Sequence, residues 1–257
     1  MRLLSPAAGT LRGWLVPGWR GAGVVLLLHG IGGSRLDMVE RARFLHAAGY
    51  TVLLFDSRAH GESSGERVTF GYLESLDARA ILGFMRRQVP GERVGVIGIS
   101  LGGAAVLVGP QPLRVRALVL EGVYPTLTEA IDDRLALRFG PLGPPLTPLL
   151  TVQLRPRLGF GADELRPIDG IDRVEAPVLL IAGTADRATT RAESQRLFAR
   201  AQPPKELWEV PGAGHVDFHQ AARAEYEARV GGFLARALRS EAADAGMGGV
   251  PVAATSR

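Results

Sequence analysis

The sequence has 257 residues, of which 46 % are hydrophobic and 22 % charged, a balance typical of a globular protein. It contains no cysteine, which excludes disulfide bonds, a thiolate nucleophile and a cysteine-ligated metal site. The net charge of +4 is small and the arginines are dispersed, so the composition does not indicate nucleic-acid binding. No apolar run approaches the roughly 18 residues that cross a membrane, and the first residues do not form a secretory signal. We therefore expect a cytoplasmic protein without a membrane span.

Strand-like and helix-like segments alternate along most of the chain. The first is a predicted edge strand at residues 11–16. Further strands are predicted at residues 24–28, 51–55, 94–98, 115–120, 177–182 and 205–210. Helices are predicted at residues 37–48, 72–88, 190–200 and 219–238, with another beginning after Ser100. This alternation predicts an α/β protein with a mostly parallel, doubly wound sheet flanked by helices.

Residues 121–170 interrupt the alternation. They contain several prolines and no apolar run of strand length, so we expect an insertion of short helices between two strands. Residues 1–240 are predicted to form a single domain that contains this insertion. The remaining residues, 241–257, are rich in alanine and glycine and are expected to form a flexible tail.

Small residues surround Ser100, which follows a predicted strand and precedes a predicted helix. Gly98 and Gly102 complete the pattern G-x-S-x-G, which is typical of a nucleophile elbow. The chain must turn there within one residue, so a Cβ atom at either glycine should collide with a neighbouring element. A glycine-rich turn without catalytic function is the alternative interpretation.

A serine nucleophile needs a base to accept its proton and a third group to orient that base. His215 follows the last predicted strand and is the candidate base. Asp186 follows the penultimate strand and is the candidate orienting acid, although it could instead cap the next helix, and Glu121 is a rival. The carboxyl ends of parallel strands lie at one edge of a sheet, so these residues should meet. His215 and His219 lack a third ligand motif, and we expect neither a metal nor another cofactor.

Five motifs in order make the chain resemble the α/β-hydrolase superfamily, specifically the serine hydrolases of the bacterial esterase and serine-aminopeptidase-like branch. The resemblance runs from about residue 11 to residue 238. The motifs are His29-Gly30, Asp56-x-Arg58-x-His60-Gly61-x-Ser63, Gly98-x-Ser100-x-Gly102-Gly103, Gly183-x-x-Asp186 and Gly214-His215. Ala59 departs from the family pattern, which usually has glycine at this position.

The resemblance implies a catalytic triad of Ser100, Asp186 and His215. It also implies an oxyanion hole formed by the backbone N–H groups of Ile31 and Leu101. Residues 121–170 would be the lid that this family inserts. Arg58 and His60 are interpreted as structural ties of their loop rather than catalytic groups.

Several apolar residues of the 121–170 segment, among them Tyr124, Leu127 and Leu146, are candidates for substrate binding. They could equally pack the segment against the body of the protein. Arginines of the segment, including Arg134, are interpreted as ordinary solvated bases rather than as a site for an anionic substrate.

The predicted activity is hydrolysis of carboxylic esters with small to medium acyl groups through an acyl-enzyme. A thioesterase and a small-peptide amidase or aminopeptidase remain alternatives, because the same triad serves all three. A non-catalytic binding protein on the same scaffold is a further alternative. The expected partner is a small-molecule ester, with no nucleic acid, and the oligomeric state is left open.

Overall fold

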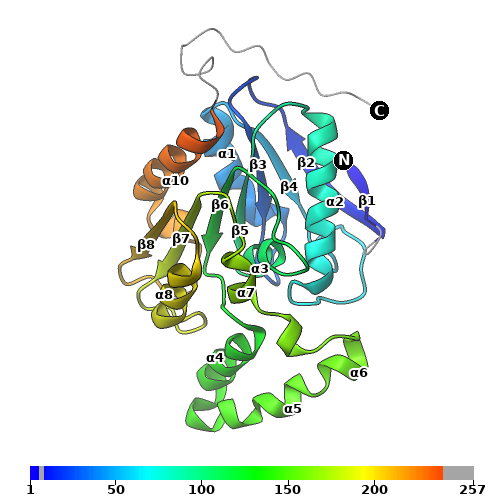
Figure 1. Cartoon of the computed structure of the whole chain (residues 1–257), viewed down its shortest axis with the longest axis vertical. Helices are drawn as coiled ribbons and strands as arrows, with labels where there is room; N and C mark the ends of the chain where they lie inside the picture. The colour runs from blue at the N-terminus through cyan, green and yellow to red at the C-terminus, as the bar shows by residue number, and fades with distance from the viewer. Residues whose placement is uncertain (6–8, 240–257) are drawn as a thin grey trace.

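The computed structural model describes residues 1–5 and 9–239, which form a twisted sheet with helices on both faces (Figure 1). The strands are β1 (Arg2–Ser5), β2 (Gly9–Val16), β3 (Val24–Leu28), β4 (Thr51–Phe55), β5 (Val94–Ile99), β6 (Ala117–Glu121), β7 (Val178–Gly183) and β8 (Lys205–Val210). They lie in the order β1-β2-β4-β3-β5-β6-β7-β8. β2 pairs antiparallel with β1 and β4, and all pairs from β4 to β8 are parallel. The predicted fold class is confirmed.

Helices fill the connections between the strands. They are α1 (Val39–Ala47), α2 (Tyr72–Gln88), α3 (Leu101–Leu107), α4 (Leu127–Phe139), α5 (Thr147–Thr151), α6 (Leu154–Leu158), α7 (Pro167–Ile171), α8 (Arg191–Arg200), α9 (Phe218–Ala221) and α10 (Arg223–Leu238). Short 3-10 helices are η1 (Arg35–Met38), η2 (Gly140–Leu142), η3 (Pro144–Leu146) and η4 (Ala162–Glu164).

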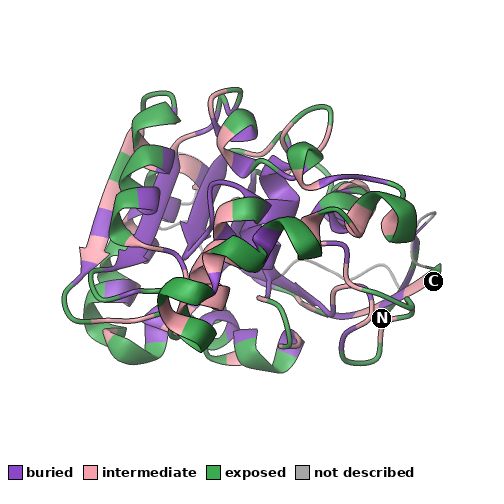
Figure 2. Cartoon of the chain, turned by 90° about the horizontal axis from the view of Figure 1, so that it is seen from below, coloured by how far each residue is buried: buried purple, intermediate pink, exposed green. Residues whose placement is uncertain are grey.

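The core consists of two apolar layers, one on each face of the sheet. Strands β3 and β6 are buried along their whole length, as expected for strands covered on both faces. One layer joins the sheet to α2, α3, α7 and α8, and the other joins it to α1 and α10. Figure 2 shows the buried strands between helices whose outer surfaces are exposed. The hydrophobic effect of this burial stabilises the sheet that carries the loops.

Parallel pairing brings the carboxyl ends of the central strands to one edge. Ile99 pairs with Glu121 across β5 and β6, and Gly183 pairs with Val210 across β7 and β8. The loops that carry Ser100, Asp186 and His215 begin at this edge, as the sequence predicts.

The segment between β6 and β7 contains short helices, as expected. Helices α4, α5 and α6 lie beyond the end of the sheet, apart from the two helical layers (Figure 1). Several apolar side chains of this segment are exposed to solvent. These exposed side chains are Leu137, Phe139, Leu142, Leu146, Leu149, Leu150 and Val152.

Two predictions of secondary structure are wrong. The strand at residues 11–16 is not an edge strand, because β1 pairs with its outer side. Strand β1 has only four residues and buries only Leu3 and Ser5, so its apolar pattern is too short to identify. The helix predicted at 219–238 is interrupted at Ala222, where φ is −143° and ψ is 51°, between α9 and α10. The predicted tail at 241–257 lies outside the described residues.

The described residues include no helix that combines the length and the apolar character needed to cross a membrane.

Candidate active site

Ser100 lies at a sharp turn between β5 and α3. Its backbone has φ 47° and ψ −109°, a conformation that non-glycine residues seldom adopt. A Cβ atom on Gly98 would lie 2.7 Å from the backbone of Gly103, and one on Gly102 would lie 2.4 Å from Leu28 O. Both glycines are therefore required by close backbone contacts, as expected for an elbow. The Ser100 N–H donates to Glu121 O at 2.8 Å and ties the turn to the end of β6.

Asp186 and His215 lie in direct contact. Asp186 Oδ2 is 2.8 Å from His215 Nδ1, and Asp186 Oδ1 accepts hydrogen bonds from the N–H groups of Ala188 and Thr189 at 2.8 and 2.9 Å. Burial alone would raise the pKa of Asp186, but these hydrogen bonds and the neighbouring imidazole hold it below its ordinary value. An ionised carboxylate only accepts, so His215 Nδ1 carries the proton and Nε2 is left as the basic nitrogen.

The two alternatives for the acid have different structural roles. Helix α8 is capped by Thr190, in a capping box with Glu193, so Asp186 is not the cap of that helix. Glu121 is fully buried and accepts hydrogen bonds from Arg41 and from the hydroxyl of Tyr226. Its carboxylate is therefore occupied by Arg41 and Tyr226, and the hydrogen bond to His215 comes from Asp186 instead.

Ser100 and His215 line the same cavity, which has a volume of about 600 Å³. The His215 ring packs over Gly122, where a Cβ atom would lie 3.1 Å from Cε1 of the ring. Gly122 has φ 55° and directly follows β6, beside the Ser100 turn. Within the described residues no hydrogen bond joins Ser100 Oγ to the imidazole. Such contacts are often long in free enzymes and shorten when substrate binds.

Two backbone N–H groups next to Ser100 have no partner among the described residues: those of Ile31 and Leu101. Leu101 begins α3, where the first N–H groups of a helix lack an intrahelical acceptor. The loop that carries Ile31 lies against the elbow, since a Cβ atom on Gly30 would be 3.7 Å from Ser100 Cβ. Both donors are thus available for an oxygen atom bound at Ser100.

Two histidines hold the Ile31 loop in place. The Gly32 N–H donates to His60 Nε2 at 3.0 Å, and His60 Nδ1 lies 2.7 Å from Arg58 O. His29 Nε2 accepts from Ser57 N–H at 2.9 Å, and its Nδ1 lies 2.7 Å from Gly30 O. Burial lowers the pKa of His29, so the ring stays neutral with the proton on Nδ1.

The remainder of the loop that carries His60 is anchored by charge pairs. Arg58 Nε lies 2.7 Å from Asp77 Oδ2 in a buried ion pair. Asp56 accepts from the N–H groups of Arg35 and Glu62. Ala59 has φ 56°, in the left-handed region that favours glycine, which accounts for the glycine of the family pattern at this position. These contacts support the interpretation of Arg58 and His60 as structural ties.

Replacing His60 with leucine is expected to lower kcat for the predicted ester hydrolysis by about 10²-fold with little change in KM, because the loss of the Gly32 acceptor displaces the loop that carries a candidate oxyanion donor. His60→Gln, which retains an acceptor, should recover part of the rate. His46→Leu, a change at an exposed histidine of α1, is the matched control. Steady-state kinetics on folded variants test this, and an unchanged kcat in His60→Leu would contradict it.

Asp186→Asn is expected to lower kcat by about 10⁴-fold while the protein stays folded, because an amide at this position favours the wrong imidazole tautomer. Asp163→Asn, at an exposed carboxylate of η4, should retain full activity. Circular dichroism and a denaturation curve verify folding. If Asp186→Asn were as active as the unmodified protein, Asp186 would not be the residue that orients His215.

A buried cluster around Arg41 was not predicted from the sequence. The guanidinium of Arg41, in α1, is fully buried and contacts Glu121 at the end of β6, Asp217 two residues after His215, and the Tyr226 hydroxyl in α10. Burial alone would lower the pKa of Arg41, but the charge of Glu121 and the hydrogen bonds hold it above its ordinary value. The cluster thus joins the His215 loop to the sheet. A buried arginine on an amphipathic helix has no distinguishing pattern in the sequence.

The candidate substrate-binding residues are only partly brought together. Tyr124 and Leu127 line a second cavity, of about 100 Å³, that reaches Ser100. Its other lining residues are Ile31, Phe70, Leu101, Ala130, Ile131 and Arg134. Leu146 lines neither cavity and is 39 % exposed.

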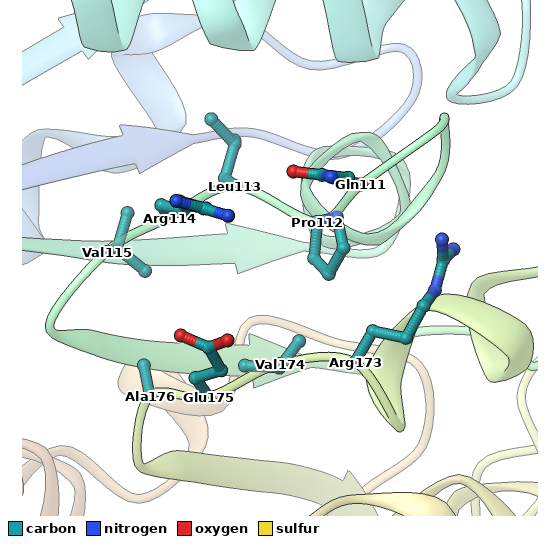
Figure 3. Close-up of a pocket in the computed structure, with 9 residues that line it drawn as sticks. All are labelled: Gln111, Pro112, Leu113, Arg114, Val115, Arg173, Val174, Glu175 and Ala176. Carbon is teal, nitrogen blue, oxygen red and sulfur yellow. The ribbon is translucent and has the colours of Figure 1, made fainter.

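A further cavity lies at the opposite end of the sheet. It has a volume of about 260 Å³ and is formed by residues just before β6 and β7, including Val115 and Ala176 (Figure 3). Because β5, β6 and β7 are parallel, this is the amino-terminal edge, far along the strands from Ser100. It contains none of the candidate catalytic residues. The described residues also contain no cluster of histidine, aspartate and glutamate that could hold a metal ion.

Comparisons with known proteins agree with this architecture. A family model described as "Alpha/beta hydrolase family" matches residues 25–229. The uncharacterized protein Rv2307c of Mycobacterium tuberculosis is 36 % identical over 212 residues, which cover 80 % of this chain and 68 % of that protein. The uncharacterized protein YqkD of Bacillus subtilis is 25 % identical over 219 residues, covering 82 % and 70 %. The structure of the esterase Pf2001 of Pyrococcus furiosus is similar with a TM-score of 0.74 and 28 % identity, over 92 % of this chain and 91 % of that one.

Proposed function

Because this chain belongs to the alpha/beta hydrolase family, we propose that it is a serine hydrolase that cleaves carboxylic esters of small to medium acyl groups through an acyl-enzyme. The observation that carries the proposal is the Asp186–His215 hydrogen bond beside a cavity that Ser100 also lines. The esterase Pf2001 is similar over nearly its whole length, which supports ester hydrolysis over other reactions of this family.

In the first half of the proposed reaction, Ser100 Oγ attacks the ester carbonyl carbon as His215 Nε2 accepts the hydroxyl proton. The carbonyl oxygen becomes negative and is stabilised by the N–H groups of Ile31 and Leu101. Asp186 stabilises the imidazolium that forms. The carbon–oxygen bond to the alcohol then breaks, the alcohol leaves with the proton from His215, and Ser100 carries the acyl group.

In the second half, water attacks the acyl carbon as His215 accepts a proton from it. The bond to Ser100 Oγ breaks, His215 returns the proton to Ser100, and the carboxylic acid leaves. Every proton that His215 accepts is thus returned within one turnover. No group beyond the side chains, the two N–H donors and water is required by this scheme.

The segment between β6 and β7 is proposed to be a lid that forms one wall of the acyl site. Tyr124 precedes α4 and Leu127 begins it, and both line the 100 Å³ cavity at Ser100. Tyr124 is fixed there, since its hydroxyl donates to Phe70 O at 3.0 Å. A cavity of this size suits a short acyl chain better than a long one.

The proposal is tested with a fluorophosphonate, which reacts with an activated serine, followed by intact-mass and peptide analysis. We expect one adduct, on Ser100, and release of nitrophenol from short-chain nitrophenyl esters. Comparing kcat/KM for ester, thioester and aminoacyl-amide substrates with the same acyl group separates the three hydrolase activities. A folded protein that neither reacts with the probe nor cleaves any of these substrates would be a binding protein, and the proposal would be wrong.

A further inference from the structure

The two cavities at Ser100 differ in which catalytic groups they contain. His215 lines only the larger cavity, whereas Leu101 lines only the smaller one, and Ser100 and Ile31 line both. The leaving alcohol takes its proton from His215, so it must occupy the larger cavity. The acyl chain therefore extends into the smaller cavity.

Arg134, in α4, lines both cavities. Among the described residues, no other lysine or arginine lines either cavity. Its Nη1 donates to Ala130 O at 2.8 Å and to Ala188 O at 3.1 Å, which fixes the guanidinium between α4 and the Asp186 loop. Within the described residues, its Nε and Nη2 donate no hydrogen bond and it forms no ion pair. These donors match the two oxygens of a carboxylate.

The other arginines between residues 121 and 170 differ from Arg134. Arg155 pairs with Asp163 and Glu164, and Arg166 pairs with Asp169. Arg138 and Arg157 are exposed and line neither cavity. Only Arg134 combines a fixed position at the site with unused donors.

The carboxylates around the site do not neutralise Arg134. Glu121 and Asp217 are paired with Arg41, and Asp186 is bonded to His215. Asp37 is exposed at the loop side of the larger cavity, where its carboxylate accepts from Ser34 N–H. Burial and the neighbouring Glu193 raise the pKa of Asp133 to about 7, so this neighbour of Arg134 holds a proton in many molecules near neutral pH.

From these positions we propose that Arg134 binds a carboxylate at the far end of the acyl group, so that the preferred substrates are half-esters of short dicarboxylic acids. This inference rests on the proposed ester hydrolysis for its placement of the acyl group. The apolar wall of Tyr124 and Leu127 contacts the methylene carbons between the ester and the carboxylate. The guanidinium then determines selectivity by charge, whereas the small cavity limits the length of the chain.

The kinetic test compares monomethyl glutarate with the analogue in which a carboxamide replaces the free carboxylate, which has nearly the same size without the charge. For the unmodified protein we expect kcat/KM to be about tenfold or more higher for the carboxylate, since a charge-assisted hydrogen bond is absent from the amide. Arg134→Gln should reduce this ratio to about one, and Arg134→Lys should retain part of it. Arg138→Gln removes the same charge one turn along α4 and should leave the ratio unchanged.

A purely structural function of Arg134, as a tie to Ala188, would give a different result. In that case Arg134→Gln would lower kcat/KM for the two esters by the same factor and leave their ratio unchanged. That outcome would overturn the inference, as would a ratio near one in the unmodified protein.

A calorimetric titration separates this inference from the proposed function. Ser100→Ala is titrated with monomethyl glutarate and with the carboxamide analogue, and the same is done with Ser100→Ala/Arg134→Gln. Tighter binding of the carboxylate by about tenfold, lost with Arg134, supports the anion site even if the unmodified protein cleaves no ester. Cleavage of neutral esters without any preference for the carboxylate would instead retain the hydrolase and exclude the anion site.

Discussion

Replacing Ser100 with alanine is expected to lower kcat for ester hydrolysis by about 10⁵- to 10⁶-fold, because the variant lacks the oxygen that forms the acyl-enzyme. The fold should be retained. The Ser100 side chain makes no hydrogen bond within the described residues, and alanine retains its Cβ atom. Stopped assays with nitrophenyl esters over long incubations measure the residual rate.

A matched control for Ser100→Ala is Ser64→Ala, a change of the same size at an exposed serine. The control should react with a fluorophosphonate and turn over substrate at the unmodified rate, whereas Ser100→Ala should do neither. Activity in Ser100→Ala above about one part in a hundred of the unmodified value would show that another group is the nucleophile. The triad would then have to be abandoned, even with the Asp186–His215 contact in place.

Arg41→Leu is expected to lower the free energy of unfolding by about 3–5 kcal/mol, because it leaves the fully buried carboxylate of Glu121 without its cation. Denaturation with urea measures the effect. Arg43→Leu, an exposed change on the same helix, should alter stability by less than about 0.5 kcal/mol. The double variant Arg41→Leu/Glu121→Leu should regain much of the loss, since the fully buried carboxylate is then absent and only the partly exposed Asp217 lacks its partner.

The loss of unfolding free energy in Arg41→Leu should become smaller at acidic pH. Burial alone would raise the pKa of Asp217, but Arg41 holds it below its ordinary value of 3.8. A carboxyl whose pKa is lowered by folding stabilises the protein above that ordinary value and loses this contribution as the pH falls through the folded value. The stability difference between the unmodified protein and Arg41→Leu should therefore narrow on acidification below pH 3.8. A difference that widens there would contradict the assignment.

Much of the sheet could be predicted from local patterns. Strands β3, β4 and β8 and helix α2 have the predicted limits, because each is a run with one clear periodicity between glycine, proline or polar residues. Strand β1 was missed because a four-residue strand at the edge has too few buried positions to show a pattern. The break at Ala222 was missed because alanine favours helix, so the local pattern contains no signal that would end a helix there.

The candidate triad was predictable for a different reason. Each of its residues directly follows a strand, and parallel strands bring their carboxyl ends to one edge. Arg41, Gly122 and Arg134 were not identified, or not as parts of the site, because their importance depends on neighbours that are distant in sequence. Leu146 shows the limit of the sequence in the opposite direction, since an apolar residue of the segment was a candidate for substrate binding and its side chain is 39 % exposed in the structure.

The sequence by itself determined the order of strands and helices, the glycines around Ser100 and the identity of the groups that gather at the carboxyl edge. These follow from local physics, namely hydrophobic periodicity and the space that a backbone turn allows. Only the tertiary structure decided which acid contacts His215, which buried arginine ties its loop to the sheet, and which of several arginines lines the two cavities at Ser100. Those outcomes depend on burial and on distances between separate elements, because the pKa of an ionisable group and the strength of its ion pairs are determined by burial and by the neighbouring charges.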